Sequence, residues 1–258
     1  MPKHWLIRNG FNDSAYLSMI ESITKLGYEY TLIDTIPFSN EYDVPDLPLD
    51  SVIVYGGQGF IEYGKNKGYG GVFFNDNFNV KTWLDNWKDE VLNYNSVIGT
   101  IGDIQTDLQK FFIRPLHDNK KFSGQIMNLS DFNHWKYLLS KIDGYSTVDL
   151  KTEIVISSIK NILVEYRIIV VNGKYITGSE YKRADRVAYF PFVPEYVQEY
   201  VEKVCSKWIP DKAFCLDIAE VEIDGVWQCK ILEVNCVNGI GLYCCDTDNY
   251  VNAISSCF

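Results

Sequence analysis

The sequence predicts a protein of mixed helices and strands in two parts, and two observations support this prediction. Short strand-like and helix-like segments alternate up to about residue 105, a pattern typical of a small parallel α/β domain. Beyond that point the sequence changes to long strand pairs with helices between them, which is typical of an α+β domain. We therefore expect an α/β domain over residues 1–105 and an α+β domain over residues 106–258.

The first part begins with an apolar strand-like segment, "HWLIRN", followed by helical spacing in "SAYLSMIESITKLG". Asp13 or Ser14 is a candidate cap for this helix, and Gly27 is a candidate stop. Two β-rich segments follow, "YEYTLID" and "SVIVYGG", and "NVKTWLDNWKDEVLN" predicts a helix that closes the domain. The glycines between Gly56 and Gly71 form neither GxGxxG nor GxxxxGK[ST], so we interpret them as loop glycines.

The second part contains two long hairpins. A strand "KFFIRP", a polar loop "LHDNKKFSG", a returning strand "QIMNL", a helix "DFNHWKYLLSKIDG" and a strand "TEIVIS" come first. "NILVEYRIIVVNGKYITGSEYK" predicts a hairpin about Asn172-Gly173, because Asn-Gly is a strong turn signal. An amphipathic helix, "PEYVQEYVEKVCSKW", separates it from the second hairpin, "FCLDIAEVEIDGVWQCKILEVN".

Composition argues against several classes of protein. The formal net charge of −10 does not suit general electrostatic binding of nucleic acid, although a local basic site could still hold a small polyanion such as ATP. The start of the chain lacks the apolar core of a signal peptide, and no apolar run approaches membrane-spanning length. Seven cysteines lie from Cys205 onward without a CxxC pair, so we expect reduced thiols in a cytoplasmic protein rather than a zinc site.

The register of the last hairpin decides whether Asp217 lies beside Glu233. A two-residue turn at Asp224-Gly225 would place Asp217 opposite Leu232, facing away from Glu233. A three-residue loop with a bulge at Gly225 would instead pair Asp217 with Ile231.

The second register is favoured because it gathers the remaining charged and polar positions on one wet face: Glu220, Glu222, Gln228 and Lys230. It puts Asp217, Glu233 and Asn235 together in a largely apolar wall. Two adjacent carboxylates in such a wall resist ionisation together, and a hard cation such as Mg²⁺ would satisfy both. The alternative is a structural polar cluster without metal.

Two further groups of polar residues accompany this one. Arg114 ends an apolar strand, and the loop after it can fold over phosphates through Lys120, Lys121, Ser123 and Gly124. The alternative is a solvated turn.

The Asn172-Gly173 hairpin carries the other group. If Val171 pairs with Lys174, four charged residues share a face: Glu165, Arg167, Glu180 and Lys182. They form either a surface ion cluster or, over a nucleotide, a site in which Arg167 and Lys182 contact phosphoryl and acyl oxygens.

In this order the segments resemble the ATP-grasp superfamily of carboxylate–amine ligases. The resemblance covers residues 105–245 and includes a hairpin similar to the superfamily's magnesium hairpin, while the preceding region is similar to a pre-ATP-grasp domain. The chain most resembles a compact clade, found in bacteria and phages, that is named for two arginines and a lysine. "FIRP", "DNKKFSG" and "VEYR" carry this closer match. The chain departs from the pattern of the superfamily in two respects. It is short, and its segment "CVNGIGLY" lacks the Ser-Pro-Gly often found there.

The resemblance implies an ATP-grasp fold, with a first lobe over residues 106–155, a second lobe over residues 156–258 and ATP between them. It also implies ATP-dependent formation of an amide bond through an acyl phosphate. Mg²⁺ would be held by Asp217, Glu233 and Asn235. The implied nucleotide-binding residues are Arg114, Lys120, Ser123 and Gly124 at the phosphates, and Ile156 and Ser157 beside the adenine.

Arg167 and Lys182 would hold the acyl phosphate, and loop 117–124 would close over it. The substrates we expect are an amino acid and the end of a peptide or protein, in the cytoplasm of a bacterial or phage-infected cell, with no nucleic acid or membrane partner. A small-metabolite ligase and a non-catalytic nucleotide-binding regulator are the alternatives.

Overall fold

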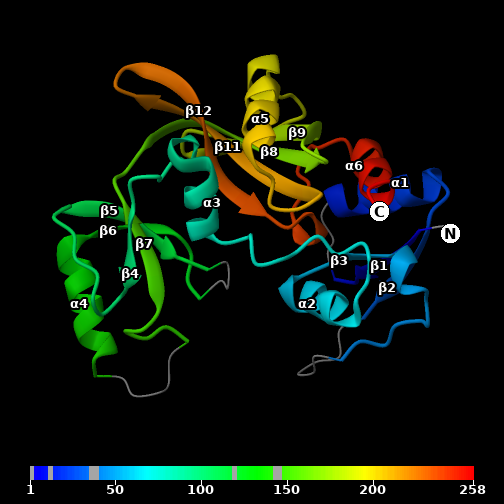
Figure 1. Ribbon diagram of the computed structural model, residues 1–258, viewed down its shortest axis with the longest axis horizontal. Helices are drawn as coiled ribbons and strands as arrows, with labels where there is room; N and C mark the ends of the chain where they lie inside the picture. The colour runs from blue at the N-terminus through cyan, green and yellow to red at the C-terminus, as the bar shows by residue number, and fades with distance from the viewer. Residues whose placement is uncertain (1–2, 11–13, 35–40, 118–120, 142–146) are drawn as a thin grey trace.

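The computed structural model describes residues 3–10, 14–34, 41–117, 121–141 and 147–258, which form three sheets with helices packed against them. Figure 1 shows the three-stranded sheet at one end of the molecule, the four-stranded sheet at the other, and the five-stranded sheet between and above them. Among the described residues, no helix is long and apolar enough to cross a membrane.

The N-terminal sheet is parallel, with the strand order β2-β1-β3. Its strands and two helices are β1 (His4–Arg8), α1 (Ser14–Lys25), β2 (Glu29–Ile33), β3 (Val52–Tyr55) and α2 (Gln58–Lys67). Strand β1 is apolar on both faces: Trp5 and Ile7 pack with α1 and α6 (Thr247–Ser255), and Leu6 packs with Phe60 of α2. The last helix of the chain therefore completes the core of the first domain.

The second sheet is antiparallel, in the order β4-β7-β5-β6. It consists of β4 (Val97–Thr100), β5 (Lys110–Pro115), β6 (Gln125–Asn128) and β7 (Glu153–Ser157), with α4 (Leu129–Leu139) against one face. The rings of Phe111 and Phe132 meet edge-to-face at 5.6 Å between centroids in its small core. We call this unit the small lobe.

The third sheet is also antiparallel, in the order β10-β9-β8-β11-β12, and we call it with its helices the large lobe. Its strands are β8 (Asn161–Val171), β9 (Lys174–Arg183), β10 (Arg186–Phe190), β11 (Ala213–Ile223) and β12 (Val226–Asn235). Helices α3 (Val80–Trp87) and α5 (Glu195–Lys207) bury Trp83, Trp87 and Val201 against this sheet. Three short 3₁₀ turns complete the structure: η1 (Leu49–Ser51), η2 (Lys88–Glu90) and η3 (Val237–Gly239).

The expected boundary at residue 105 differs from the arrangement of the elements. Strand β4 precedes that residue yet pairs with β7 in the small lobe. Helix α3, expected to close the first domain, packs on the large lobe because its buried tryptophans face that sheet. The adjoining residue Leu92 donates its backbone N–H to the Ile231 carbonyl, so the small lobe begins after this point.

The turn of the last hairpin also differs from the expected one. Asp224 and Gly225 both have positive φ, 53° and 77°, and Ile223 pairs with Val226 across a two-residue turn. A two-residue turn with φ > 0 at both positions matches the right-handed twist of the strands. The predicted three-residue loop with a bulge at Gly225 is therefore wrong.

Asp217 nevertheless lies opposite Glu233, because the register shifts further along the hairpin. Ile218 pairs with Ile231, while Asp217 pairs with Glu233, so Leu232 is an extra residue in β12. This β-bulge supplies the one-residue shift that was expected at the turn.

The predicted wet face of this hairpin is not formed. Across β11 and β12, Gln228 and Lys230 pair with Val221 and Ala219, whereas Glu220 and Glu222 pair with Cys229 and Trp227. The two acidic residues therefore lie on the opposite face from Gln228 and Lys230. The two-residue turn sets this parity, since side chains alternate between faces from the turn onward.

The segment after β12 fastens the large lobe to the N-terminal sheet. The buried Asn238 amide donates to the carbonyls of Val54 and Gly71, at 2.6 and 2.7 Å, and accepts from the Phe73 N–H at 2.8 Å. A Cβ at Gly239 would lie 2.5 Å from the Gly56 carbonyl oxygen, so only glycine fits this close approach.

Candidate active site

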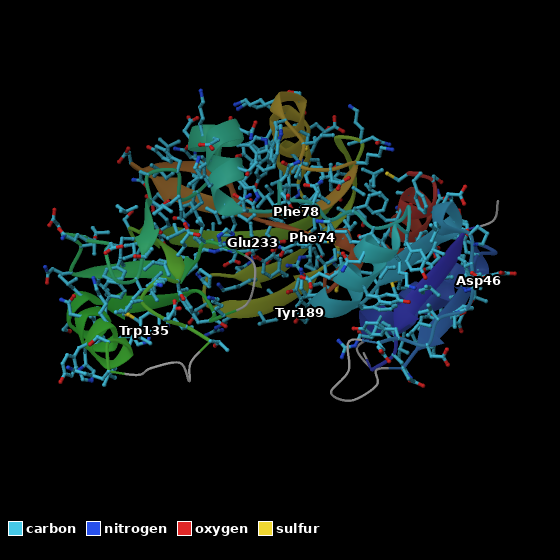
Figure 2. The ribbon with its side chains drawn as sticks, turned by 60° about the horizontal axis from the view of Figure 1, so that its bottom comes forward. Asp46, Phe74, Phe78, Trp135, Tyr189 and Glu233 are labelled. Carbon is cyan, nitrogen blue, oxygen red and sulfur yellow. The ribbon has the colours of Figure 1, made fainter. Side chains whose placement is uncertain are left out.

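A cavity of about 570 Å³ lies between the small and large lobes. Its wall comes from β5 and the segment that precedes β6 on one side, and from β8, β9 and β12 on the other. Six of the predicted site residues line it: Arg114, Ser123, Gly124, Lys182, Glu233 and Asn235. Figure 2 labels Glu233, which lies in the middle of the molecule between the lobes.

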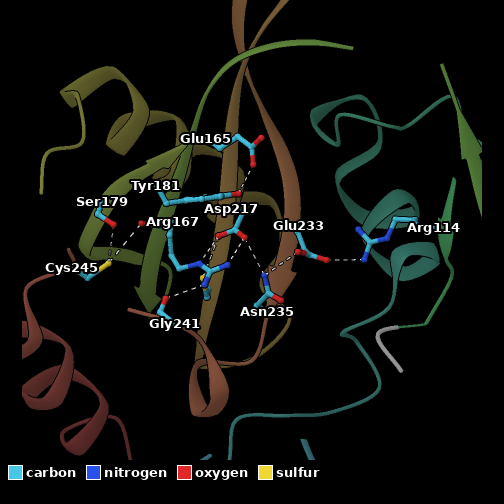
Figure 3. Close-up of polar contacts among 11 residues, drawn as sticks. Arg114, Glu165, Arg167, Ser179, Tyr181, Asp217, Glu233, Asn235, Gly241 and Cys245 are labelled. Carbon is cyan, nitrogen blue, oxygen red and sulfur yellow. Dashed lines mark hydrogen bonds and ion pairs between the residues drawn. The ribbon is translucent and has the colours of Figure 1, made fainter. Parts of the chain in front are cut away.

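The acidic centre of the cavity is formed where β11 and β12 bulge. Asp217 pairs with Glu233 and Cys215 with Asn235, so Asp217, Glu233 and Asn235 share one face, as the sequence predicts. The Asn235 Nδ2 atom lies 3.3 Å from Asp217 Oδ2 and 3.5 Å from Glu233 Oε2 (Figure 3). One amide thus bridges two carboxylates.

Each carboxylate also accepts hydrogen bonds from an arginine (Figure 3). Arg167, opposite Asp217 on the neighbouring strand, donates through Nε to Oδ1 at 2.9 Å and through Nη2 to Oδ2 at 2.8 Å. Its remaining nitrogen, Nη1, donates to the Gly241 carbonyl at 2.9 Å. Arg114 of the small lobe donates through Nη2 to Glu233 Oε1 at 2.7 Å, across the cavity.

Burial and charge act on Asp217 in opposite directions. The residue is 2 % exposed, and burial raises the pKa of its carboxyl above the ordinary value, while the Arg167 guanidinium acts to lower it. Nearby Glu233 adds a like charge that raises the pKa further. A further positive charge at this centre would therefore stabilise the ionised form.

The donor set suits a magnesium ion. Mg²⁺ prefers carboxylate and carbonyl oxygens, usually with only one or two carboxylates from the protein. Asp217 and Glu233 provide two carboxylates, and turning the Asn235 amide would present its oxygen to the same point. In the described part of the chain, no group of three or more His, Cys, Asp or Glu is placed to hold a metal ion, so any such site here depends on the amide.

The hairpin of β8 and β9 brings a second charged group to the cavity. Val171 pairs with Lys174 as predicted, and Lys182 donates to Glu165 Oε1 at 2.6 Å. Tyr181 donates to the other oxygen of Glu165 at 2.7 Å.

Glu180 was expected on this face, and that prediction is wrong. It pairs with Tyr166 on the opposite face and accepts hydrogen bonds from Arg183, at 2.8 Å from Nε. The physical reason is a bulge between the Ile169 and Val170 pairs, which makes Ile176 an extra residue in β9 and reverses the facing of residues 177–180. A second bulge, between the Glu165 and Tyr166 pairs, makes Tyr181 an extra residue and returns Lys182 to the predicted face.

The predicted adenine-binding residues lie apart from the cavity lining. Ile156 packs in the core of the small lobe and is paired with Val97 on one side and Ile113 on the other. Ser157 ends β7 opposite Phe112, which does line the cavity, and its buried hydroxyl has no hydrogen-bond partner among the described residues. Their role beside adenine stays a prediction.

The predicted phosphate loop is described only in part. Lys120 lies outside the described residues, and Lys121 Nζ is 3.4 Å from the Thr152 hydroxyl. Gly124 lies against the Phe112 ring, where an added Cβ would be 2.6 Å from the nearest ring atom. This contact places the backbone next to the cavity where a side chain would not fit.

Two tyrosines that the sequence pattern did not single out contact Arg167. The Arg167 Cζ atom lies 5.5 Å from the ring centroid of Tyr181 and 4.7 Å from that of Tyr243, within the range of cation–π contacts. Tyr181 reaches the site through the bulge in β9, and Tyr243 comes from the loop after η3 with a positive φ of 50°. Neither feature has a clear signal in the sequence.

Two lobes around a cavity with paired carboxylates, arginines and a lysine define a nucleotide-dependent ligase of the ATP-grasp class. Residues 95–253 match the model of an ATP-grasp domain family, the second family of the clade named for two arginines and a lysine. This match covers more than half of the chain, so the protein belongs to that family. It is an ADP-forming carbon–nitrogen ligase that uses ATP and Mg²⁺.

Solved structures share the fold along nearly the whole chain. The D-cycloserine synthetase DcsG is 10% identical, with a TM-score of 0.63 and 98% of both chains covered. The ATP-grasp ligase PsnB, in complex with a minimal precursor, is 10% identical, with a TM-score of 0.58 and 98% of both chains covered. A D-alanine–D-alanine ligase from Bacillus anthracis is 12% identical, with a TM-score of 0.54, covering 97% of this chain and 92% of that one. A search of curated sequences gave no significant match.

Proposed function

We propose that the protein joins an amino acid to the end of a peptide or protein through an acyl-phosphate intermediate. The observation that supports this most is the meeting of Asp217, Glu233 and Asn235 from the large lobe with Arg114 from the small lobe. A cavity with carboxylates on one wall and a cation on the other suits a metal–triphosphate complex, because each component has a partner of opposite charge.

When bound by Asp217, Glu233 and Asn235, Mg²⁺ would neutralise phosphate charge during phosphoryl transfer. Arg114 would exchange its bond to Glu233 for contacts with phosphate oxygens, beside the backbone of Ser123 and Gly124. The substrate carboxylate then attacks the γ-phosphorus, and the bond between this phosphorus and the β–γ bridging oxygen breaks to release ADP.

The second step forms the amide bond. The amine nitrogen attacks the acyl carbon, the bond from that carbon to the phosphate oxygen breaks, and the nitrogen releases its extra proton. In this step Arg167 and Lys182 would stabilise the oxygens that gain charge, because cations held near those oxygens lower the cost of the developing charge. Lys182 would change its partner from Glu165 to the substrate.

The proposal is tested by measuring ADP release with MgATP and either free amino acids or amino acids plus short peptides. ADP release that requires both pools supports it, and release with a small metabolite alone would favour a metabolite ligase. Nucleotide binding without ADP release from any pool would favour a non-catalytic regulator.

The variant Glu233→Gln tests whether turnover depends on the acidic centre of the cavity. The substitution keeps the size and hydrogen-bonding capacity of the side chain but removes one charge facing the metal position. Turnover should fall by about 100-fold or more, the usual scale for one preorganised electrostatic contact. Glu222→Gln, on the same hairpin and exposed, is the matched control and should leave turnover unchanged. Normal turnover by Glu233→Gln at low magnesium concentration would contradict the assignment.

A further inference from the structure

A column of three tyrosines leads from Arg167 to the edge of the large sheet. The Tyr243 ring stacks on Tyr181 at 5.1 Å and on Tyr189 at 5.2 Å, with interplanar angles of 14° and 23°. The inner end of the column meets the Arg167 guanidinium, and the outer end, Tyr189, is 56 % exposed on β10. The column therefore connects the candidate active site with solvent.

Backbone irregularities place the rings of this column. In the pairing of β10 with β9, Ala188 and Tyr189 stand opposite Tyr181 alone, so β10 also has a bulge. Tyr243 adopts a positive φ of 50°, which is uncommon for a bulky residue and costs free energy. Bulges that re-aim side chains are frequent beside active sites. Irregularities at all three rings suggest that the column is used by the protein rather than being incidental packing.

The strand that carries Tyr189 is an exposed apolar edge. β10 is the outermost strand of the five-stranded sheet, and large apolar side chains on and just after it are more than half exposed: Val187, Tyr189, Phe190 and Phe192. Natural sheets usually protect their edges with charged residues, prolines or covering elements, because an open edge pairs with other chains. Figure 2 shows Tyr189 in the space between the small lobe and the N-terminal domain.

We propose that β10 and the tyrosine column bind an extended polypeptide substrate, which adds to β10 as a sixth strand with its reacting end directed to Arg167. This inference rests on the proposed function. In such strand addition, main-chain hydrogen bonds give affinity and contacts with alternate side chains give specificity. Each step of the column, from Tyr189 to Tyr243 and from there to Arg167, is near 5 Å. About three extended residues, at ~3.3 Å each, would span this distance.

Charge favours a substrate peptide over a second copy of the chain on this edge. Each copy carries a formal charge of −10, so two copies repel each other. The exposed Arg186 begins β10 and offers a local positive charge to an acidic side chain of a peptide. The expected ligand is therefore an extended peptide with apolar side chains and an acidic residue.

The test selects peptides from a library of random dodecapeptides displayed on phage, using the full-length protein as bait. The double variant Val187→Ser/Phe190→Ser removes two exposed apolar side chains without touching the tyrosine column. Tyr137→Ser is the matched control, since Tyr137 is 58 % exposed on α4 of the small lobe, whereas β10 belongs to the large lobe. Wild type and control should enrich the same peptides, and the double variant should bind a selected peptide roughly tenfold or more weakly.

Hydrogen exchange then locates the bound peptide. A selected peptide should slow exchange of the amides in residues 186–190 of the wild-type protein. No enrichment, or equal binding by all three proteins, would overturn the proposal. Slower exchange at these amides at high protein concentration without peptide, together with a dimer mass in solution, would assign the edge to a second copy.

Turnover distinguishes failure of this inference from failure of the proposed function. If wild type and the double variant release ADP equally from the peptide and amino-acid pools, the proposed docking site is contradicted and the proposed ligase reaction is supported. If peptide selection depends on β10 but no pool gives ADP release, the docking site is supported and the proposed reaction is contradicted.

Discussion

The large lobe and the small lobe each contribute one arginine to the acidic centre, but the two arginines are held very differently. Arg167 makes two hydrogen bonds to Asp217 and one to Gly241, and it lies beside two stacked tyrosine rings. Arg114 makes one resolved ion pair, to Glu233, and that contact crosses between the lobes. Arg167 is therefore held within its own sheet, whereas the ion pair of Arg114 joins two lobes and could be exchanged for contacts with a phosphate.

The architecture of the two lobes explains this difference. Strands β8 and β11, which carry Arg167 and Asp217, have 11 residues each and lie in the middle of the five-stranded sheet. Strand β5, which carries Arg114, has six residues and belongs to a sheet with a smaller core. Longer, centrally placed strands fix side-chain positions through more ladder hydrogen bonds and packing contacts. We infer that the large lobe is the rigid half of the site.

The largest expected effect comes from Arg167→Gln. This variant leaves the Asp217 carboxyl buried without its cation, and breaking a buried ion pair costs roughly 3–5 kcal/mol of the free energy of unfolding. Urea denaturation at neutral pH measures this loss. A loss below about 1 kcal/mol would show that Arg167 is not a fixed part of the large lobe.

The same variant should respond to pH in a defined direction. Burial already raises the pKa of Asp217, and Arg167 opposes that shift, so removing Arg167 raises this pKa further. A group whose folded-state pKa is raised contributes stability below its unfolded pKa and loses that contribution as pH rises through the folded pKa. The deficit of Arg167→Gln relative to wild type should therefore shrink as the pH is lowered and Asp217 becomes protonated.

Arg114→Gln should affect turnover strongly and stability only slightly. Its ion pair is partly exposed and spans the cavity, so the free energy of unfolding should change by less than about 1 kcal/mol. MgATP turnover should fall by about 100-fold, because a cation facing the phosphates is lost. Lys110→Gln, an exposed position on the same strand, is the control and should change neither quantity. A large loss of stability without a loss of turnover would contradict the division between the lobes.

The sequence correctly predicted which residues form the acidic centre, but it did not predict the strand register that brings them together. Asp217, Glu233 and Asn235 were expected on one face because carboxylates and an amide alternate with apolar residues, and alternation is visible in a sequence. The shift that aligns them is a bulge at Leu232, an ordinary strand residue. The Asp224-Gly225 turn was correctly located but wrongly sized, since Asp-Gly is compatible with both loop lengths.

The features that the sequence did not reveal depend on contacts between distant segments. Glu180 changes face because of the bulge at Ile176, and Tyr243 reaches Arg167 from a loop more than seventy residues away. Strand β4 was assigned to the first domain because its partner, β7, lies more than fifty residues later. Local periodicity contains no information about such partners, so a strand and its distant neighbour cannot be matched from spacing alone.

The last and smallest expected effect is a change in stability on substitution of Glu90, which lies in η2 and contacts the large lobe. Glu90 accepts from Lys207 at 2.7 Å and lies 3.2 Å from Lys203, both on α5. Burial alone would raise the pKa of the Glu90 carboxyl, but the two ammonium groups outweigh burial and hold this pKa below its ordinary value. This contact ties the segment before β4 to the large lobe, although the sequence assigned it to the first domain.

Glu90→Gln should therefore destabilise the protein by about 1–2 kcal/mol at neutral pH, because the lysines lose a charged partner but are themselves partly exposed. A carboxyl with a lowered folded-state pKa contributes stability above its unfolded pKa, and this contribution is lost as the pH falls through the folded pKa. The difference between wild type and variant should accordingly vanish in acid. Urea denaturation curves collected from neutral to acidic pH, with Glu199→Gln on α5 as a control, measure this effect. If the difference persisted at acidic pH, the charge of Glu90 would not be what holds η2 on the large lobe.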